Sequence, residues 1–198
     1  MPSPQPAPSP SPAPSPRPVT VAGLVLAAGA GRRYGMPKAL ARHHGRLFVE
    51  HAADVLLEAG CDPVLVVLGA AADDVVAAAP DLPGVVVNPD WATGMASSLK
   101  AGLAALNADA VVILLVDMPG VTAEAVRRIA AHAAPGALVM GGYGDRRGHP
   151  VLLGREHWAG VAASATGDRG ARDYLRTHDV TVVPVGDVAD DTDIDHPN

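Results

Sequence analysis

Short runs of apolar residues alternate with amphipathic segments along most of the chain, and this alternation predicts strands and helices in turn. The predicted strands lack polar alternation and cover residues 20–26, 63–68, 84–88, 110–116, 137–140 and 181–185. Apolar residues at helical spacing predict helices over residues 47–59, 71–79 and 121–133, with two more that end near Leu106 and His178. Unbroken apolar strands are typical of a parallel sheet covered on both faces. The pattern therefore predicts an α/β fold with a mostly parallel central sheet.

Two stretches of this pattern are less regular. Residues 141–152 carry several glycines and predict an irregular loop or a hairpin with two arginines at its tip. The last predicted strand contains Pro184, which has no N–H to donate to a neighbouring strand. We therefore expect this strand at an edge of the sheet.

Composition sets the first 18 residues apart from the rest of the 198-residue chain. Residues 1–18 are almost entirely Pro, Ser and Ala, which cannot bury enough apolar surface to fold, and they predict a disordered tail. This tail has neither the basic start nor the apolar centre of a signal peptide. Residues 19–198 are long enough for one domain. Because hydrophobic residues make up 48% of the chain and aromatic residues only 3%, the core must consist of Val, Leu, Ile and Ala.

Charge and cysteine content argue against several classes of function. The net charge of −6 disfavours a general nucleic-acid-binding protein. No apolar run approaches the roughly 20 residues of a membrane helix, which predicts a soluble protein. Cys61 is the only cysteine, which excludes an internal disulfide and fits a reducing cytoplasm. Its place between a predicted helix and a predicted strand favours an inert thiol over a nucleophile.

The stretch after the first predicted strand has the layout of a phosphate-binding loop. It turns through three glycines within residues 29–35, where small residues let backbone N–H groups approach a ligand. The basic residues Arg32, Arg33 and Lys38 follow closely and suit a polyphosphate. The alternative is an ordinary strand-to-helix turn with solvated basic residues. The spacing matches neither a P-loop nor a dinucleotide-binding fingerprint.

Small polar residues mark a second candidate binding segment. Gly94, Ser97 and Ser98 lie near the start of a predicted helix, where free N–H groups and hydroxyls can bind a base, a ribose or an anion. Capping of that helix by Thr93 is the alternative.

Asp117 ends the most apolar of the predicted strands. A carboxylate at the carboxyl end of a central parallel strand points into the crevice where open α/β sheets bind ligands, so Asp117 is the predicted Mg²⁺ ligand. A helix-capping role is the weaker alternative, since Thr122 can cap the helix that follows, with Glu124 in its first turn. Further carboxylates that could attract a metal ion crowd the C-terminus: Asp187, Asp190, Asp191, Asp193 and Asp195.

Residues 26–38 read LAAGAGRRYGMPK and resemble the signature LAAGxGxRMGxPK of the MobA-like nucleotidyltransferases. One position differs, because Tyr34 stands where the family has Met. Within that family, the AAG and PK forms of the motif are more similar to the molybdenum cofactor cytidylyltransferases than to the guanylyltransferases.

Other segments resemble the same family in the expected order, so that the resemblance covers residues 20–198. These segments are NxxWxxGMxxS at 88–98, Asp-x-Pro at 117–119, Gly-His-Pro-Val-Leu at 148–152, Gly-Asp-x-Gly-Ala-Arg at 167–172 and Asp-Ile-Asp-His-Pro at 193–197. The last departs from the family pattern, because His196 stands where Thr is usual and the helix that follows in the family is not in the sequence.

The resemblance implies a three-layer α/β/α Rossmann-like nucleotidyltransferase domain over residues 19–198, with Mg²⁺ as cofactor. It implies catalytic roles for Arg33, Lys38 and Asp117, and metal binding by Asp117 and Asp195. The implied nucleotide contacts are Leu26, Ala27, Ala28, Gly29, Gly31, Arg33, Lys38, Asn88, Gly94, Ser97 and Ser98. Weaker candidates for acceptor contacts are Arg147, His149, Asp168 and Arg172. For Asp168 a helix-capping role is the alternative, and metal binding by His149 is disfavoured because no His or Cys stands at ligand spacing.

The implied reaction is attack of an acceptor phosphate on the α-phosphorus of a nucleoside triphosphate, with release of pyrophosphate and no covalent enzyme intermediate. The cytidylyltransferase branch implies CTP as donor and molybdopterin as acceptor, and a molybdoenzyme or its maturation chaperone as a further partner. One alternative is another small phosphorylated acceptor, such as a sugar, a polyol or phospholactate. The other is a non-catalytic accessory protein that binds nucleotide or molybdopterin and delivers the cofactor. Neither nucleic acid nor a membrane is an expected partner.

Overall fold

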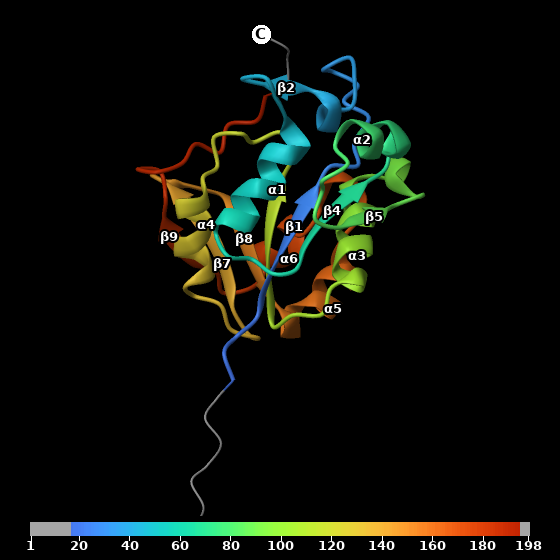
Figure 1. Cartoon of the computed structure of the whole chain (residues 1–198). Helices are drawn as coiled ribbons and strands as arrows, with labels where there is room; N and C mark the ends of the chain where they lie inside the picture. The colour runs from blue at the N-terminus through green and yellow to red at the C-terminus, as the bar shows by residue number, and fades with distance from the viewer. Residues whose placement is uncertain (1–16, 195–198) are drawn as a thin grey trace, which may run out of the picture.

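The central element of the structure, a computed structural model that describes residues 17–194, is a seven-stranded sheet (Figure 1). Its strand order is β5-β4-β1-β6-β8-β7-β9. The strands are β1 (Val21–Leu26), β4 (Val64–Leu68), β5 (Val85–Val87), β6 (Ala110–Leu115), β7 (Leu138–Tyr143), β8 (Arg146–Gly154) and β9 (Thr181–Pro184). Among these strands β8 alone runs antiparallel, and its neighbours are β6 and β7. The predicted mostly parallel sheet is confirmed.

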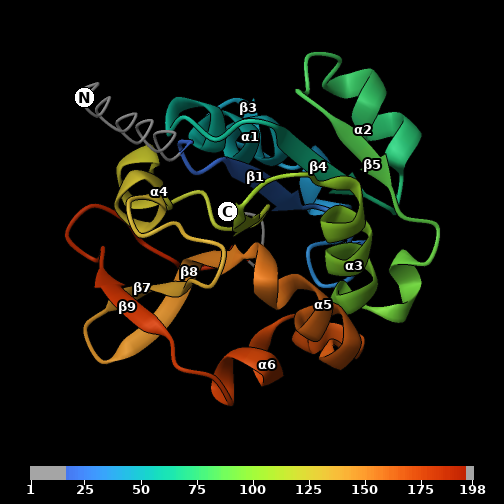
Figure 2. The same ribbon diagram turned by 90° about the horizontal axis from the view of Figure 1, so that it is seen from below.

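Helices cover both faces of this sheet (Figure 2). One layer holds α1 (Phe48–Glu58), α2 (Ala72–Ala78) and α4 (Ala123–Ala130), and the other holds α3 (Met95–Ala105), α5 (Arg155–Ser164) and α6 (Arg172–Arg176). Short 3-10 turns lie at Lys38–Leu40, Trp91–Thr93 and Gly167–Arg169, and a small hairpin pairs β2 (Arg42–His43) with β3 (Arg46–Leu47). The three-layer α/β/α architecture is therefore confirmed.

Small residues bring the helices close to the sheet. Successive residues of β1 point to opposite layers, and the side chains of Leu24 and Val25 are both fully buried. Gly102 of α3 faces Leu24, and a Cβ at this glycine would lie 2.6 Å from the Leu24 Cδ1 atom. Because no larger side chain fits there, α3 can pack closely on β1.

The predicted elements match the structure closely in the first half of the chain and less well in the second half. The irregular segment at 141–152 is the β7–β8 hairpin, and β8 inserts between β6 and β7. Helix α5 was not predicted, since Trp158 and Val161 are its only buried residues and its apolar periodicity is faint. The single helix expected up to His178 is wrong. Gly167 and Gly170 adopt left-handed backbone conformations (φ +53° and +52°) and divide it into a 3-10 turn and α6.

The edge position predicted for the last strand is confirmed, because within residues 17–194 β9 pairs with β7 alone, at the end of the strand order. Most of the expected tail at 1–18 lies outside the described residues. Of its last two residues, Arg17 forms two hydrogen bonds with the carboxylate of Asp109, at 2.6 and 2.7 Å. Within residues 17–194, no helix has the length and apolar character to cross a lipid bilayer.

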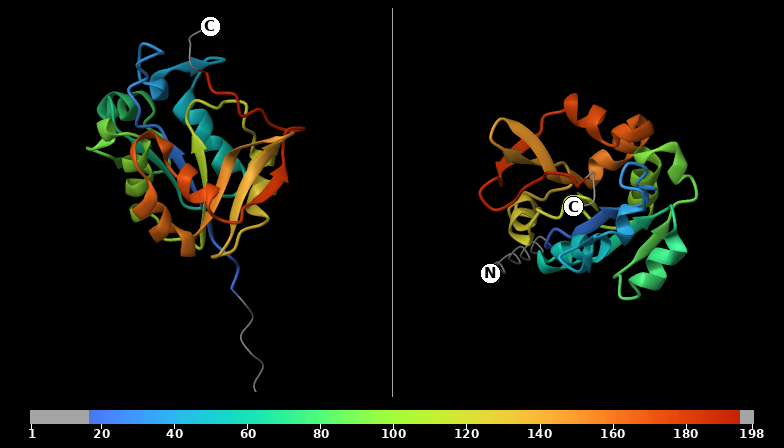
Figure 3. Two further views of the ribbon diagram at one scale, coloured as in Figure 1. Left: turned by 180° about the vertical axis from the view of Figure 1, so that it is seen from behind. Right: turned by 90° about the horizontal axis from the view of Figure 1, so that it is seen from above.

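The order of the strands determines where a ligand can bind. From β1 the chain moves outward through β4 and β5, and then returns to place β6 on the other side of β1. The register pairs Leu26 with Leu115, so the carboxyl ends of β1 and β6 lie level with each other. Figure 3 shows this end of the sheet from above. Ligands of open α/β sheets bind at such a reversal of strand order, outside the carboxyl ends of the strands.

Candidate nucleotide-binding site

A cavity of about 370 Å³ opens at the carboxyl ends of β1 and β6. The glycine loop forms one wall, and the 3-10 turn at Trp91–Thr93 together with the first turn of α3 forms another. The end of β6, including Asp117, closes the inner side, and Asp168 of the 3-10 turn at Gly167–Arg169 lines the cavity beside the first turn of α3. The cavity thus lies at the place that the strand order favours.

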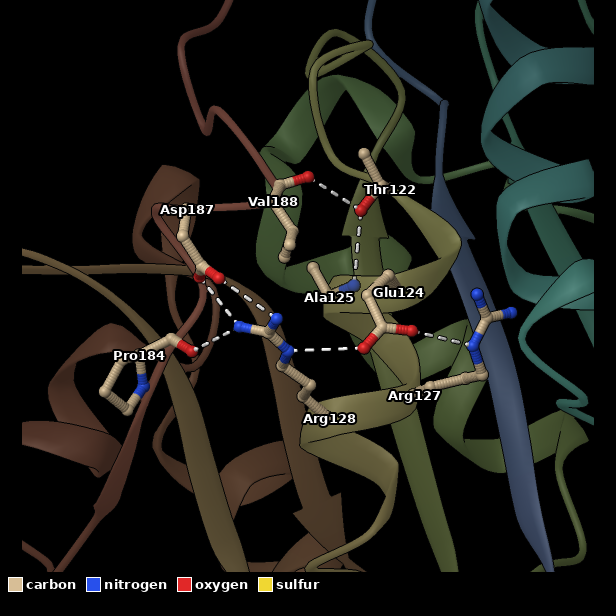
Figure 4. Close-up of polar contacts among 8 residues, drawn as sticks. All are labelled: Thr122, Glu124, Ala125, Arg127, Arg128, Pro184, Asp187 and Val188. Carbon is tan, nitrogen blue, oxygen red and sulfur yellow. Dashed lines mark hydrogen bonds and ion pairs between the residues drawn. The ribbon is translucent and has the colours of Figure 1, made fainter.

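A larger hollow of about 700 Å³ lies at the β7 and β9 edge, but its chemistry is less suited to a phosphate ligand. Arg128 is the only cation among the described residues that line it. Its guanidinium already binds Asp187 through two hydrogen bonds, at 2.7 and 3.0 Å, and Glu124 at 3.3 Å (Figure 4). We therefore place the functional site in the smaller cavity.

Two glycines of the loop have different roles: one fixes the shape of the turn, and the other leaves room for a ligand. Gly31 adopts a left-handed conformation (φ +59°), and a Cβ there would collide with the carbonyl oxygen of Met36. Gly35 donates its N–H to the Gly31 carbonyl oxygen at 2.8 Å, which closes the turn. Gly29 has open space where a Cβ would be, and it lines the cavity. Gly31 is thus required by the fold of the loop, whereas Gly29 leaves room for a ligand.

Lys38 and Asp117 meet at the inner side of the cavity. Lys38 begins the 3-10 turn after the glycine loop, and its Nζ lies 2.8 Å from Oδ2 of Asp117 at the end of β6. Both side chains are mostly buried, with 13% and 20% of their surface exposed. The carboxylate therefore has a cation beside it, in the cavity that the glycine loop also lines.

The donor set at Asp117 fits a magnesium ion that a protein carboxylate and substrate phosphates hold together. Within residues 17–194, no three His, Cys, Asp or Glu side chains gather into a metal-binding cluster. Mg²⁺ usually keeps several waters and takes one or two carboxylates together with substrate phosphates, so a single strand-end carboxylate facing a phosphate loop suits it. The second expected ligand, Asp195, lies outside the described residues. The last described residue, Ile194, donates its N–H to the Asp117 carbonyl oxygen at 3.0 Å.

Asn88 and Ser97 lie behind the cavity wall, whereas Gly94 and Ser98 line it. Asn88 is 3% exposed, and its amide donates hydrogen bonds to the hydroxyls of Ser97 and Ser98 at 2.8 and 3.0 Å. Its side-chain oxygen accepts from the N–H of Asp90 at 3.0 Å. The structure therefore uses Asn88 to position the first turn of α3.

The capping roles considered for Thr93 and Asp168 are both wrong. Helix α3 follows Gly94 without a side-chain cap from Thr93, whose hydroxyl donates to the Asp90 carbonyl oxygen at 2.7 Å. Asp168 does not cap α6, but accepts the N–H of Met95 in the first turn of α3 at 3.3 Å. Its carboxylate thus closes the cavity next to Gly94.

His149 is the most perturbed of the acceptor-side candidates. Its ring is half-buried, and burial lowers its pKa to about 4, against the raising effect of Asp117 and Asp191; Arg172 lowers it further. The ring of His149 is therefore neutral near pH 7, and it lies close enough to Asp117 for that carboxylate to affect its pKa. Arg147 and Arg172 are exposed.

The basic residues of the loop are arranged differently from expectation. Arg32 lines the cavity, whereas Arg33 is exposed outside its wall. Trp91 and Met95 also line it and were absent from the predicted site residues, although both stand in the segment that resembles the family. Cys61 is buried and does not line the cavity. Burial raises the pKa of its thiol to about 11, as expected for an inert cysteine.

Comparison with known proteins identifies the family of the chain. The model of the MobA-like NTP transferase domain matches residues 23–182. A solved structure of Rv0371c from Mycobacterium tuberculosis H37Rv is 32% identical, with a TM-score of 0.77 over 88% of this chain and 93% of that one. Another structure of Rv0371c, a complex with manganese, has a TM-score of 0.74 at the same identity over 88% of this chain and 94% of that one.

Two curated relatives differ in their reactions. Nicotine blue oxidoreductase of Paenarthrobacter nicotinovorans is 42% identical over 79% of this chain and 81% of its own length. A probable molybdenum cofactor guanylyltransferase of Opitutus terrae is 37% identical over 52% of this chain and 50% of its own length. With a family model that matches most of its length and a glycine loop facing a strand-end carboxylate, the chain belongs to the MobA-like NTP transferase domain family.

Proposed function

We propose that the protein transfers a nucleotidyl group from a nucleoside triphosphate to a small acceptor that carries a phosphate. The observation that carries this proposal is the contact between Lys38 and Asp117 at the inner end of the glycine loop. A cation, a carboxylate and the backbone of the glycine loop line one cavity there, which suits the triphosphate of a nucleotide.

In the proposed reaction an oxygen of the acceptor phosphate forms a bond to the α-phosphorus, and the bond from the α-phosphorus to the bridging oxygen breaks. The electron pair leaves with pyrophosphate, so no enzyme nucleophile is needed. The N–H groups of residues 28–31 orient the triphosphate, and Lys38 neutralises charge on its oxygens. Arg32 at the wall, and Arg33 if the loop turns inward, would add to this charge.

Asp117 would hold Mg²⁺, which neutralises phosphate charge and orients the reacting oxygens when it is bound. We propose Asp195 as a further ligand, because it directly follows Ile194, whose N–H donates to the Asp117 carbonyl oxygen. The neutral ring of His149, together with Arg147 and Arg172, would then face the acceptor.

For the substrates we propose CTP as donor and molybdopterin as acceptor. The AAG form of the glycine loop supports CTP, and the relative described as a molybdenum cofactor guanylyltransferase supports a molybdenum cofactor substrate. Another phosphorylated acceptor, or delivery of the cofactor to a molybdoenzyme or its chaperone, would use the same cavity.

A redox reaction is the second candidate, since the relative that is 42% identical is described as an oxidoreductase. In that case the cavity would hold the pyrophosphate of a dinucleotide electron donor rather than a triphosphate.

The experiment that separates these reactions measures two products with one protein preparation. Pyrophosphate release is followed with CTP, GTP, ATP and UTP, with and without molybdopterin and Mg²⁺. Consumption of NADH and NADPH is followed with a quinone-like dye. We expect pyrophosphate only with CTP, molybdopterin and Mg²⁺ together, and none from Asp117→Asn. Dye reduction without pyrophosphate release would reject the transferase.

A further inference from the structure

After β9 the chain does not stay at the edge of the sheet. It runs from Gly142 of β7, whose carbonyl oxygen accepts the N–H of Val185, to Asp117, whose carbonyl oxygen accepts the N–H of Ile194. Figure 1 shows a red segment that leads from β9 toward the top of the molecule. We name residues 185–194 the C-terminal strap. The strap joins the far edge of the sheet to Asp117, about 70 residues earlier in the chain.

The strap begins with two anchors on α4 and the turn before it (Figure 4). Asp187 accepts two hydrogen bonds from the guanidinium of Arg128, at 2.7 and 3.0 Å. The hydroxyl of Thr122 donates to the Val188 carbonyl oxygen at 2.9 Å. The Arg128–Asp187 pair is partly solvent-exposed and belongs to the part of the strap closest to β9.

The second half of the strap contacts the loop that follows Asp117. Asp190 donates its N–H to the Gly120 carbonyl oxygen at 3.0 Å, and a Cβ at Gly120 would lie 2.6 Å from the Asp190 carbonyl oxygen. Ile194 then donates to the carbonyl oxygen of Asp117 itself. The backbone of the strap therefore contacts the proposed metal site at two points, Asp117 itself and the loop that follows it.

One ion pair connects this half of the strap to the β7–β8 hairpin. Asp191 has a side chain only 6% exposed, and its Oδ1 lies 3.0 Å from Nη2 of Arg146. Its other oxygen lies against the backbone of Gly148, where any Cβ would collide with it. A carboxylate this deeply buried is unfavourable without a cation beside it.

We propose that Arg146 and Asp191 are positioning residues whose ion pair holds the C-terminal strap beside Asp117 and so sets the affinity of the site for a divalent metal ion. The proposal rests on the proposed function in taking Asp117 as the metal ligand. The same pair links the acceptor side of the site, through Arg147 and His149 of β8, to its metal side.

The physical reason is the cost of an unpaired buried charge. Without Arg146 the Asp191 carboxylate has to reach water, and the strap must lift to let it do so. Lifting the strap breaks the hydrogen bonds of Asp190 and Ile194 to the Asp117 loop. Outer partners of metal ligands typically change metal affinity by about 10- to 100-fold, and we expect the lower end of this range.

The test measures Mn²⁺ alone binding to the full-length chain by electron paramagnetic resonance, for the wild type and three variants. Arg146→Ala should weaken Mn²⁺ binding about tenfold, and Arg146→Lys, which keeps the charge, should restore it. Asp187→Asn is the matched control, because it breaks the other ion pair of the strap and should leave the affinity within about twofold. Amide hydrogen exchange at Asp190 and Ile194 should speed up in Arg146→Ala only.

Arg146 is 68% exposed, so its replacement should leave the domain folded. Wild-type Mn²⁺ affinity in Arg146→Ala would overturn the proposal, as would an equal loss in Asp187→Asn. The result of this binding test does not depend on whether the protein catalyses the proposed reaction. A protein that binds Mn²⁺ through this arrangement and releases no pyrophosphate would reject the reaction and keep the role of Arg146 and Asp191.

Discussion

The Nζ atom of Lys38 lies 2.8 Å from the Oδ2 atom of Asp117, and this contact joins the end of the glycine loop to the end of β6. The two residues are 79 positions apart in the chain. The ammonium group thus occupies one oxygen of the carboxylate that would hold a metal ion in the proposed site, and it would compete with the ion there.

This contact predicts opposite effects of Lys38→Ala on metal binding and on turnover. Turnover should fall by about 100-fold or more, because a charge that stabilises the transition state is lost. Binding of Mn²⁺ alone should become a few-fold tighter, since the competing ammonium is gone, while Asp117→Asn should abolish it. Pyrophosphate release and Mn²⁺ titration measure the two effects. Lys100→Ala, at an exposed position of α3, is the control. A loss of metal affinity in Lys38→Ala would show that the lysine supports the metal.

The two loop glycines should respond differently to alanine. Gly31→Ala should lower the free energy of unfolding by about 1–3 kcal/mol, because it forces a left-handed conformation onto a residue with a Cβ and collides with Met36. Gly29→Ala should leave stability unchanged and weaken nucleotide binding, because its Cβ points into open cavity space. Thermal unfolding and calorimetric titration with CTP measure the two effects. Equal loss of stability in both variants would contradict the distinction.

Asn88→Ala should destabilise the fold by about 1–3 kcal/mol, because it removes a buried amide that bonds Ser97 and Ser98. Any loss of nucleotide affinity in Asn88→Ala should be smaller than the loss in Ser98→Ala, because Ser98 lines the cavity. Urea unfolding with Asn107→Ala as an exposed control measures the first effect. Unchanged stability together with lost CTP binding would instead make Asn88 a direct ligand contact.

Stability should fall as pH is lowered from about 6.5 toward 4. The pKa of His149 in the folded protein is about 4, below its ordinary value of 6.5. Between these values the unfolded chain binds a proton that the folded chain does not, so acid favours unfolding. The loss should be about 2 kcal/mol for this half-buried ring, with no further contribution from His149 below pH 4. His149→Gln should flatten the curve of unfolding free energy against pH in this window. Identical curves for both proteins would show that His149 is not protected from protonation.

Local patterns accounted for most of the fold. Apolar runs predicted β1, β4, β5 and β6 to within two residues of their observed ends, since a strand covered on both faces needs apolar residues throughout. The patterns failed between residues 155 and 178, where α5 buries only Trp158 and Val161 and two left-handed glycines interrupt the next helix. A helix with so few buried residues leaves little periodicity to detect.

The sequence by itself determined the class of fold, the glycine loop and the position of Asp117 at the end of a central strand, because each depends on residues that are neighbours in the chain. Tertiary structure alone decided that Lys38 contacts Asp117, that Asn88 lies behind the cavity wall and that the C-terminal strap returns to the site. These contacts join residues up to dozens of positions apart. Strand order, register and packing bring such residues together, and no periodicity along the chain predicts these contacts.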